Sequence, residues 1–326
     1  MKIFEQHINS TYRRFAEWKN GDPCVVFPII TDLHSALETA DRLNSQKRET
    51  LSHLLTLDAA AEKFSADFTA DLGDIGIDVP VKDPADLEKL CARYFEYRSA
   101  AKVKPAIHAI GNHDILKGVT PEFLHSMSKE VNKDCGIVSP ENVPYGYFDI
   151  ADKKCRIFYL FCNETPEFYS SEQFDFIEKH LAELPADWYA IFLQHKCIHS
   201  RGRWQKNEFA PMPENYLKMH DIFASFIRKG GTIAGVFSGD SHFNLFEKLD
   251  NVNYYSNQGY GGIGPSEAPS HAILVHDFCP ALNRTDSFDS EKTCLIDVIA
   301  VKFEKRELAV FRIGAGNEKF DLFTAY

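Results

Sequence analysis

Five short segments of this chain each place a carboxylate, an amide or an imidazole directly after an apolar run. They are Ile30-Thr31-Asp32-Leu33-His34, Asp71-Leu72-Gly73-Asp74, Gly111-Asn112-His113-Asp114, Phe192-Leu193-Gln194-His195 and Ser238-Gly239-Asp240-Ser241-His242. Oxygen donors mixed with imidazoles, and without cysteine, suit Mn²⁺, Fe, Zn²⁺ or Mg²⁺ rather than a structural zinc site. Two such ions, roughly 3.5–4 Å apart, can hold a hydroxide between them for attack on a phosphate ester.

The elements that must position these side chains can be read from the apolar pattern. The sequence predicts strands at 24–30, 68–72, 106–110, 145–150, 155–162, 189–193, 232–237, 243–248, 252–256, 271–276, 294–303 and 307–313. It predicts helices at 3–19, 36–64, 84–101, 171–183 and 216–229, and loops at 114–144, 199–215 and 257–270. The opening β–α–β–α–β order favours parallel strands, and sites assemble at the carboxyl ends of such strands.

Local spacing supports the same placement. The Asp-x-His spacing of Asp32 and His34 puts both side chains on one side of an extended segment, within reach of one ion. Glycines stand beside Asp74, Asn112 and Asp240. They allow the sharp backbone turns that direct these ligands inward.

In this order, the segments resemble the motifs of the calcineurin-like metallophosphoesterase superfamily. The resemblance runs from Asp32 to His242, about two-thirds of the chain, and Gly-Asn-His-Asp is its most specific part. It implies an α/β fold, a four-layer α/β/β/α sandwich of two mixed β-sheets flanked by helices. We expect a single domain over residues 1–326, with core motifs at 25–245 and C-terminal strands at 246–315 that complete the second sheet.

The resemblance also implies a role for each matching residue. Two sites for divalent cations are expected, with Mn²⁺ or Fe favoured and Zn²⁺ or Mg²⁺ as alternatives. The first site would be held by Asp32, His34 and His242, and the second by Asn112, His195 and Asp240, with Asp74 bridging both. His113 would stand over the scissile bond and protonate the leaving oxygen or steady the transition state, and Asp114 would orient its imidazole.

The chain departs from the family at Asp240, where the family usually has Gly-His-x-His and this chain has Gly239-Asp240-Ser241-His242. If Asp240 binds metal, three carboxylates favour harder cations and make the bound water less acidic. If it does not bind, the second site is weak. The Gly-Asp segment also has no phosphate-binding arginine in its turn, so Arg201 and Arg203 are the predicted substrate contacts.

Composition limits the choice of partners. The formal net charge is −11, from 36 Lys and Arg against 47 Asp and Glu, so the protein is not expected to coat nucleic acid. No signal peptide and no apolar run long enough to span a bilayer is apparent, and the eight cysteines are scattered without a CxxC pair. These features predict a cytoplasmic protein with reduced cysteines and no membrane partner.

The sequence therefore predicts a hydrolase, a dinuclear metallophosphoesterase that cleaves a phosphate mono- or diester of a small substrate with a metal-bridging hydroxide. A small-molecule phosphodiesterase and a phosphomonoesterase both remain open, and the acidic surface makes a nuclease the weakest option. The alternative is a non-catalytic, metal-binding interaction protein that keeps the fold. Retention of His113 and of most ligands favours the enzyme.

Overall fold

The computed structural model describes most of the chain. The described residues are 3–33, 51–75, 84–115, 119–162, 168–196, 198, 214–240, 245–256, 274–275, 295–314 and 321–326. The predicted site residues His34, Arg201, Arg203 and His242 lie outside these ranges.

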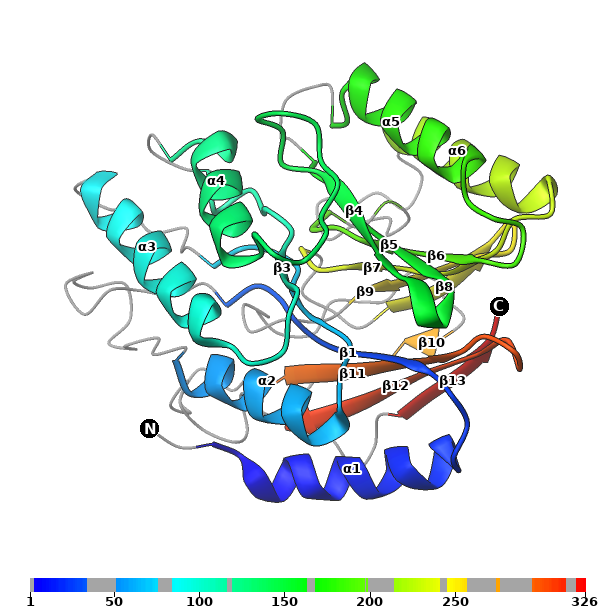
Figure 1. Ribbon diagram of the computed structural model, residues 1–326, viewed down its shortest axis with the longest axis horizontal. Coiled ribbons are helices and arrows are strands. Elements are labelled where there is room, and N and C mark those ends of the chain that lie inside the picture. Colours follow the sequence, from blue (N-terminus) through cyan, green and yellow to red (C-terminus); the bar gives the residue numbers. More distant parts are fainter. Residues whose placement is uncertain are drawn as a thin grey trace.

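Two mixed β-sheets form the centre of the molecule (Figure 1). The first has the order β13-β12-β11-β1-β2-β3. Its strands are β1 (Val25–Ile30), β2 (Thr69–Asp71), β3 (Ala106–His108), β11 (Leu295–Lys302), β12 (Glu307–Gly314) and β13 (Asp321–Ala325). Strands β1, β2 and β3 run parallel to one another, and β11 to β13 continue the sheet in antiparallel fashion from β1.

The second sheet has the order β10-β8-β9-β7-β6-β5-β4. Its strands are β4 (Gly146–Ile150), β5 (Cys155–Tyr159), β6 (Tyr189–Leu193), β7 (Ile233–Ser238), β8 (Leu245–Leu249), β9 (Val252–Ser256) and β10 (Leu274–Val275). The central strands β5, β6, β7 and β9 are parallel, and β4, β8 and β10 pair in antiparallel fashion.

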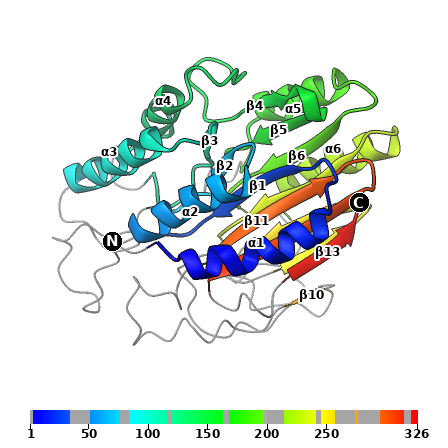
Figure 2. The ribbon, with the colours of Figure 1, turned by 60° about the horizontal axis from the view of Figure 1, so that its bottom comes forward.

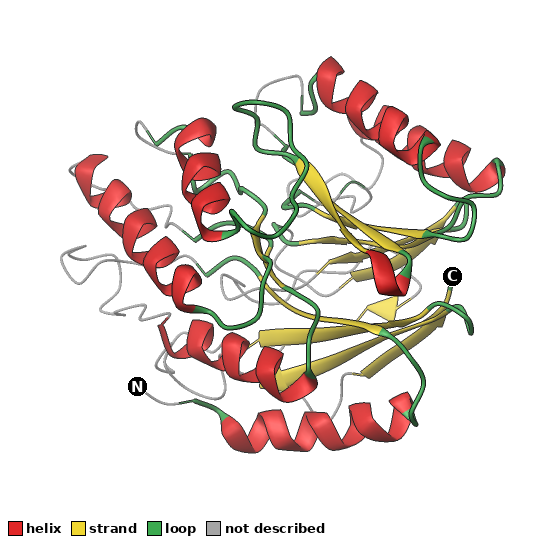
Figure 3. Cartoon of the chain, viewed as in Figure 1, coloured by secondary structure: helices red, strands yellow, loops and turns green. Residues whose placement is uncertain are grey.

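Helices cover the outer face of each sheet, which gives four layers (Figures 2 and 3). They are α1 (Glu5–Lys19), α2 (Leu51–Phe64), α3 (Pro84–Ala100), α4 (Pro121–Val131), α5 (Ser171–Ala182) and α6 (Glu214–Arg228), with a 3-10 turn at Ala151–Lys153. Helices α1 to α4 pack on the first sheet, and α5 and α6 pack on the second. Among the described residues, no helix combines the length and hydropathy that a membrane span requires.

The core between the sheets is rich in aromatic side chains. Phe27 on β1 stacks on Phe68 with ring centroids 4.5 Å apart, and meets Phe237 of the second sheet edge-on at 5.5 Å. Strands such as β1 and β7 are buried at every position, because each lies in the middle of a sheet that is covered on both faces. This continuous burial explains their uninterrupted apolar sequences and fixes where each strand ends.

The predicted fold class is confirmed, but some elements differ. Strands β8, β9 and β10 join the second sheet as expected, whereas the prediction is wrong for β11 and β12, which belong to the first sheet. Strand β13 and helix α4 were not predicted. Helix α4 lies within the segment 114–144, which was expected to be a loop. Thr120 caps α4, with its Oγ1 accepting from the Phe123 N–H at 3.2 Å, and Pro121 follows at the first helical position.

Candidate metal centre

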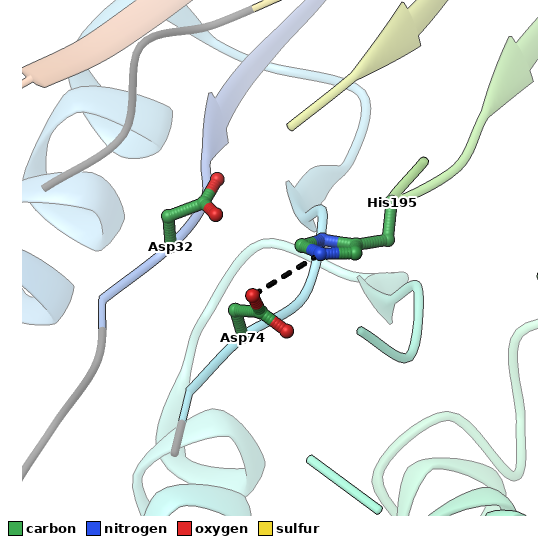
Figure 4. Close-up of side chains that lie close together, drawn as sticks. All are labelled: Asp32, Asp74 and His195. Atoms are coloured by element: carbon green, nitrogen blue, oxygen red, sulfur yellow. Dashed lines mark ion pairs between the residues drawn. The ribbon is translucent and has the colours of Figure 1, made fainter. Parts of the chain in front are cut away.

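Three predicted ligands from three strands meet between the two sheets. Asp32 follows β1, Asp74 follows β2 and His195 follows β6, and Figure 4 shows their side chains directed toward one another. One ligand atom from each residue lies within 4.8 Å of those of the other two. All three residues are almost completely buried. Buried carboxylates that face one another are costly unless a cation or a proton lies between them.

Backbone hydrogen bonds hold these strand ends together. The Asp32 N–H donates to the Gly73 carbonyl at 2.8 Å within the first sheet, and the Gly239 N–H donates to the His195 carbonyl at 2.9 Å within the second. The sheets are joined where the Asp240 N–H donates to Asp32 Oδ2 at 3.1 Å. The carboxyl ends of both parallel sets therefore face one site.

The three carboxylates share an unusual backbone conformation. Asp32, Asp74 and Asp240 all have positive φ, at 53°, 61° and 60°. Asp is among the few residue types that tolerate this left-handed region. In each case the chain turns sharply just after a strand, which brings the carboxylate into the space between the sheets.

The atoms predicted to form the second site surround His195 Nε2. Asp74 Oδ2 and Asn112 Oδ1 each lie 3.2 Å from it, and Asp240 Oδ1 lies 3.6 Å from it. Donor atoms bound to one ion at about 2.1 Å in octahedral geometry are about 3 Å apart. His195 Nδ1 lies 2.7 Å from the Leu72 carbonyl, so it carries the proton and leaves Nε2 free to act as a ligand. The residues present fit a divalent cation.

The charges at this centre favour a cation as well. Burial lowers the pKa of His195, but the nearby carboxylates of Asp74, Asp240 and Asp32 raise it well above its ordinary value. Burial raises the pKa of Asp240, and the contacts with His195 and Lys196 outweigh this and bring it to about 2. A field that attracts a proton to Nε2 so strongly also attracts a metal ion.

His113 and Asp114 both contact the Asp74 segment, in different ways. The His113 N–H donates to Asp74 Oδ1 at 2.9 Å, and its Nε2 lies 3.9 Å from Asp74 Oδ2 with 19% of the side chain exposed. The Asp114 carboxylate accepts hydrogen bonds from the backbone N–H groups of Gly111, Asp74 and Ile75 at 2.8, 3.0 and 2.7 Å. His113 therefore lies at the accessible edge of the centre, whereas Asp114 lies beneath it.

Two neighbouring residues were not predicted as part of the centre. The Lys196 Nζ donates to Asp240 Oδ1 at 2.7 Å, and His108 Nε2 lies 3.3 Å from Asp114 Oδ2. Their positions at the ends of strands β6 and β3 are the only sequence signal that marks them. The structure thus brings together Asp32, Asp74, Asn112, His113, Asp114, His195 and Asp240.

Comparison with known proteins places this arrangement in a shared fold. No family model matches the sequence, and no curated protein matches it. Among solved structures, a dimetal phosphatase from Danio rerio superposes with a TM-score of 0.64 at 14% identity, covering 94% of this chain and 100% of that one. A purple acid phosphatase from yellow lupin (Lupinus luteus) seeds gives 0.57 at 15% identity, with 93% and 54% covered.

A third similar structure is GAP50, the anchor in the inner membrane complex of Plasmodium. Its TM-score is 0.54 at 9% identity, and the match covers 93% of this chain and 89% of that one. At these identities the likeness concerns the fold. The chain shares the two-sheet α/β sandwich fold of these three structures.

Proposed function

We propose that this protein is a metal-dependent phosphoesterase of the calcineurin-like superfamily, acting on a small phosphate mono- or diester. The observation that carries the proposal is the convergence of Asp74, Asn112 and Asp240 on His195 Nε2, at distances suited to one ion. The fold shared with a dimetal phosphatase supports it. Divalent cations, when bound, neutralise charge on a phosphate ester and acidify water.

The proposal assigns metal binding and substrate binding to separate residues. Asn112, His195 and Asp240 would hold the second cation, and Asp74 would bridge to a first one held by Asp32, His34 and His242. Mn²⁺ or Fe suits this oxygen-rich set, with Zn²⁺ or Mg²⁺ as alternatives. Arg201 and Arg203 would contact the substrate phosphate. A cytoplasmic location is part of the same proposal.

His113 would transfer the proton to the leaving oxygen. Among the imidazoles of the described part of the centre, that of His113 has the partly exposed side chain, next to the buried Asp74. A group in this place can reach a substrate from solvent while its backbone N–H keeps it fixed to Asp74. General acid catalysis of this kind contributes roughly 10²–10⁴-fold.

The test is hydrolysis of mono- and bis-nitrophenyl phosphate with added Mn²⁺, before and after removal of metal with EDTA. We expect activity that EDTA abolishes and Mn²⁺ restores. His113→Asn should lower kcat by roughly 10²–10⁴-fold while the bound Mn²⁺ per chain stays the same. The matched control His125→Asn, on α4, should keep full activity. Activity on the bis compound alone would identify a diesterase.

The second candidate is a non-catalytic interaction protein that retains the fold. The similarity to GAP50, an anchor in the inner membrane complex of Plasmodium, supports this candidate. If the protein binds Mn²⁺ but hydrolyses neither nitrophenyl ester and no member of a wider ester panel, the non-catalytic candidate is supported. Hydrolysis that depends on His113 would exclude it.

A further inference from the structure

Lys196 is a buried cation at the edge of the second site. Only 8% of the residue is exposed, although lysine is rarely buried unless it is paired. Its Nζ lies 2.7 Å from Asp240 Oδ1, and the same oxygen lies 3.6 Å from His195 Nε2. One carboxylate oxygen therefore faces both the ammonium group and the position of the second cation.

The backbone of Lys196 is fixed by a dedicated set of hydrogen bonds. The Gln194 side-chain Nε2 donates to the Lys196 carbonyl at 2.7 Å, and the Tyr169 hydroxyl donates to Gln194 Oε1 at 3.2 Å. Gln194 is completely buried and Tyr169 nearly so. Burial of both partners means that Lys196 is held beside Asp240 by the core of the second sheet rather than by a mobile surface contact.

The charge balance gives the ion pair a role. Asp32, Asp74 and Asp240 bring three carboxylates to the centre, and Lys196 is the ammonium in contact with one of them. Asp240 and Lys196 together add no net charge. Without Lys196, the third carboxylate would strengthen the attraction for a divalent cation, whereas the ammonium both repels the cation and competes for Oδ1.

We propose that Lys196 is a positioning residue of the metal centre, which shares Asp240 Oδ1 with the second cation and weakens the binding of that cation. The inference rests on the proposed metal-dependent function. It lowers the affinity of the second site and makes the cation there more readily exchanged.

The test is a titration of the metal-free full-length protein with Mn²⁺. Binding is measured by calorimetry and by electron paramagnetic resonance. The Kd that responds to Asn112→Ala is assigned to the second site. Lys196→Met should lower this Kd by about tenfold, because a unit charge about 5 Å from a divalent ion has roughly this effect even at the dielectric constant of water. Asp240→Asn should raise it by a similar factor.

Three further variants separate charge from packing. The double variant Lys196→Met/Asp240→Asn removes both charges and should return the second-site Kd to near the wild-type value. Lys196→Arg keeps the charge and should also leave it nearly unchanged. The matched control Lys153→Met removes a partly buried lysine paired with Asp67, away from the centre, and should change neither Kd.

The inference is overturned if Lys196→Met leaves the second-site Kd unchanged, or if it weakens binding as a merely structural loss would. These outcomes are separable from failure of the proposed function. If the protein hydrolyses esters but Lys196→Met leaves the second-site Kd unchanged, this inference alone is rejected. Two Mn²⁺ sites that respond as described, in a protein that hydrolyses no ester, reject the enzymatic function alone.

Discussion

Asp114 supports Asp74 from below: its Oδ2 accepts a hydrogen bond from the Asp74 backbone N–H at 3.0 Å. The same oxygen accepts from the Gly111 N–H at 2.8 Å, and Oδ1 accepts from the Ile75 N–H at 2.7 Å. His108 contacts this carboxylate as well. Burial raises the pKa of Asp114, but the His108 contact and the backbone N–H of Gly111 lower it below its ordinary value. These contacts fix the backbone of the Asp74 turn, whereas the role predicted for Asp114 from the sequence was to orient His113.

The first prediction concerns this support. Asp114→Asn leaves one acceptor oxygen for three N–H donors, so the Asp74 turn should shift. We expect the affinity for Mn²⁺ to fall by roughly 10–100-fold, as is typical when a group that positions a metal ligand is changed. Calorimetric Mn²⁺ titration measures this effect. The control Asp152→Asn, at an exposed position in the turn before β5, should bind Mn²⁺ like wild type, and equal affinities in both variants would contradict the assignment.

The second prediction concerns the close approach at Gly239. A methyl group there would lie 2.0 Å from Thr31 Oγ1 and 2.7 Å from Asp32 Oδ2. Gly239→Ala should therefore displace Asp32 and weaken Mn²⁺ binding by about tenfold or more, in line with the effect of a misplaced ligand. Gly21→Ala is the comparison, because a methyl group there meets nothing within 4 Å. That variant should alter stability at most, and unchanged Mn²⁺ affinity in Gly239→Ala would refute the steric argument.

The third prediction concerns pH. Asp71 is completely buried and accepts hydrogen bonds from the Tyr94 hydroxyl and the Gly73 N–H, both at 2.9 Å. Burial raises the pKa of Asp71 to about 6, against opposing effects of His108 and the Gly73 N–H. Because this pKa is higher in the folded than in the unfolded protein, the folded state binds the proton more tightly. The contribution of Asp71 to stability is therefore greatest below about pH 4 and is lost as pH rises through about 6.

The measurement is urea unfolding of the metal-free protein at several pH values between 4 and 7. The free energy of unfolding of wild type, relative to Asp71→Asn, should fall by up to about 3 kcal/mol over this range. Comparison with the variant cancels the titration of other groups. Parallel pH profiles for the two proteins would show that Asp71 has no raised pKa.

The fourth prediction concerns a buried ion pair that joins β11 and β12. Arg312 Nε lies 2.7 Å from Asp297 Oδ1 and Arg312 Nη2 lies 2.7 Å from Oδ2, and the Tyr255 hydroxyl of the second sheet also contacts this carboxylate. Arg312→Leu leaves a buried carboxylate without its cation and should lower the free energy of unfolding by about 3–5 kcal/mol. Urea unfolding measures the change.

Two comparisons test the cause of that loss. The double variant Asp297→Leu/Arg312→Met replaces both charges by apolar groups, and it should recover most of the lost stability. Lys102→Ala breaks an exposed pair with Glu62 and should cost less than about 1 kcal/mol. A double variant as unstable as Arg312→Leu would show that shape rather than charge is responsible.

Much of the first-sheet and second-sheet core could be predicted from the sequence, because fully buried strands have continuous apolar sequences. Strand β1 and strand β6 were predicted within one residue of their observed bounds. The strand-end positions of Asp32, Asp74 and His195 followed from the same pattern. Their convergence depends on the order of the strands in the sheets. That order was expected from the resemblance to a known family and not from the apolar periodicity.

Other features could not be predicted because they depend on tertiary contacts. The sheet that β11 joins is decided by pairing with β1 across more than half the chain, and no local pattern encodes that partner. Helix α4 has a capping threonine and a first-turn proline, a signal that was present but outweighed by the polar segments around it. Lys196 carries no motif, and its importance depends on the 2.7 Å contact with Asp240.

The left-handed backbone shared by Asp32, Asp74 and Asp240 has a consequence for how the protein tolerates change. This region costs most residues roughly 1–2 kcal/mol, and Asp enters it more readily than most. Each position also holds a carboxylate near two others. Glycine at any of the three would relieve the backbone and remove a charge at once. The same change would leave the N–H groups of Asp240 and His113, or the Lys196 ammonium, without the carboxylate oxygen that accepts from them. Each of the three aspartates therefore serves the backbone turn, the local hydrogen bonds and ion binding at once, and no single substitution can improve one of these without loss in another.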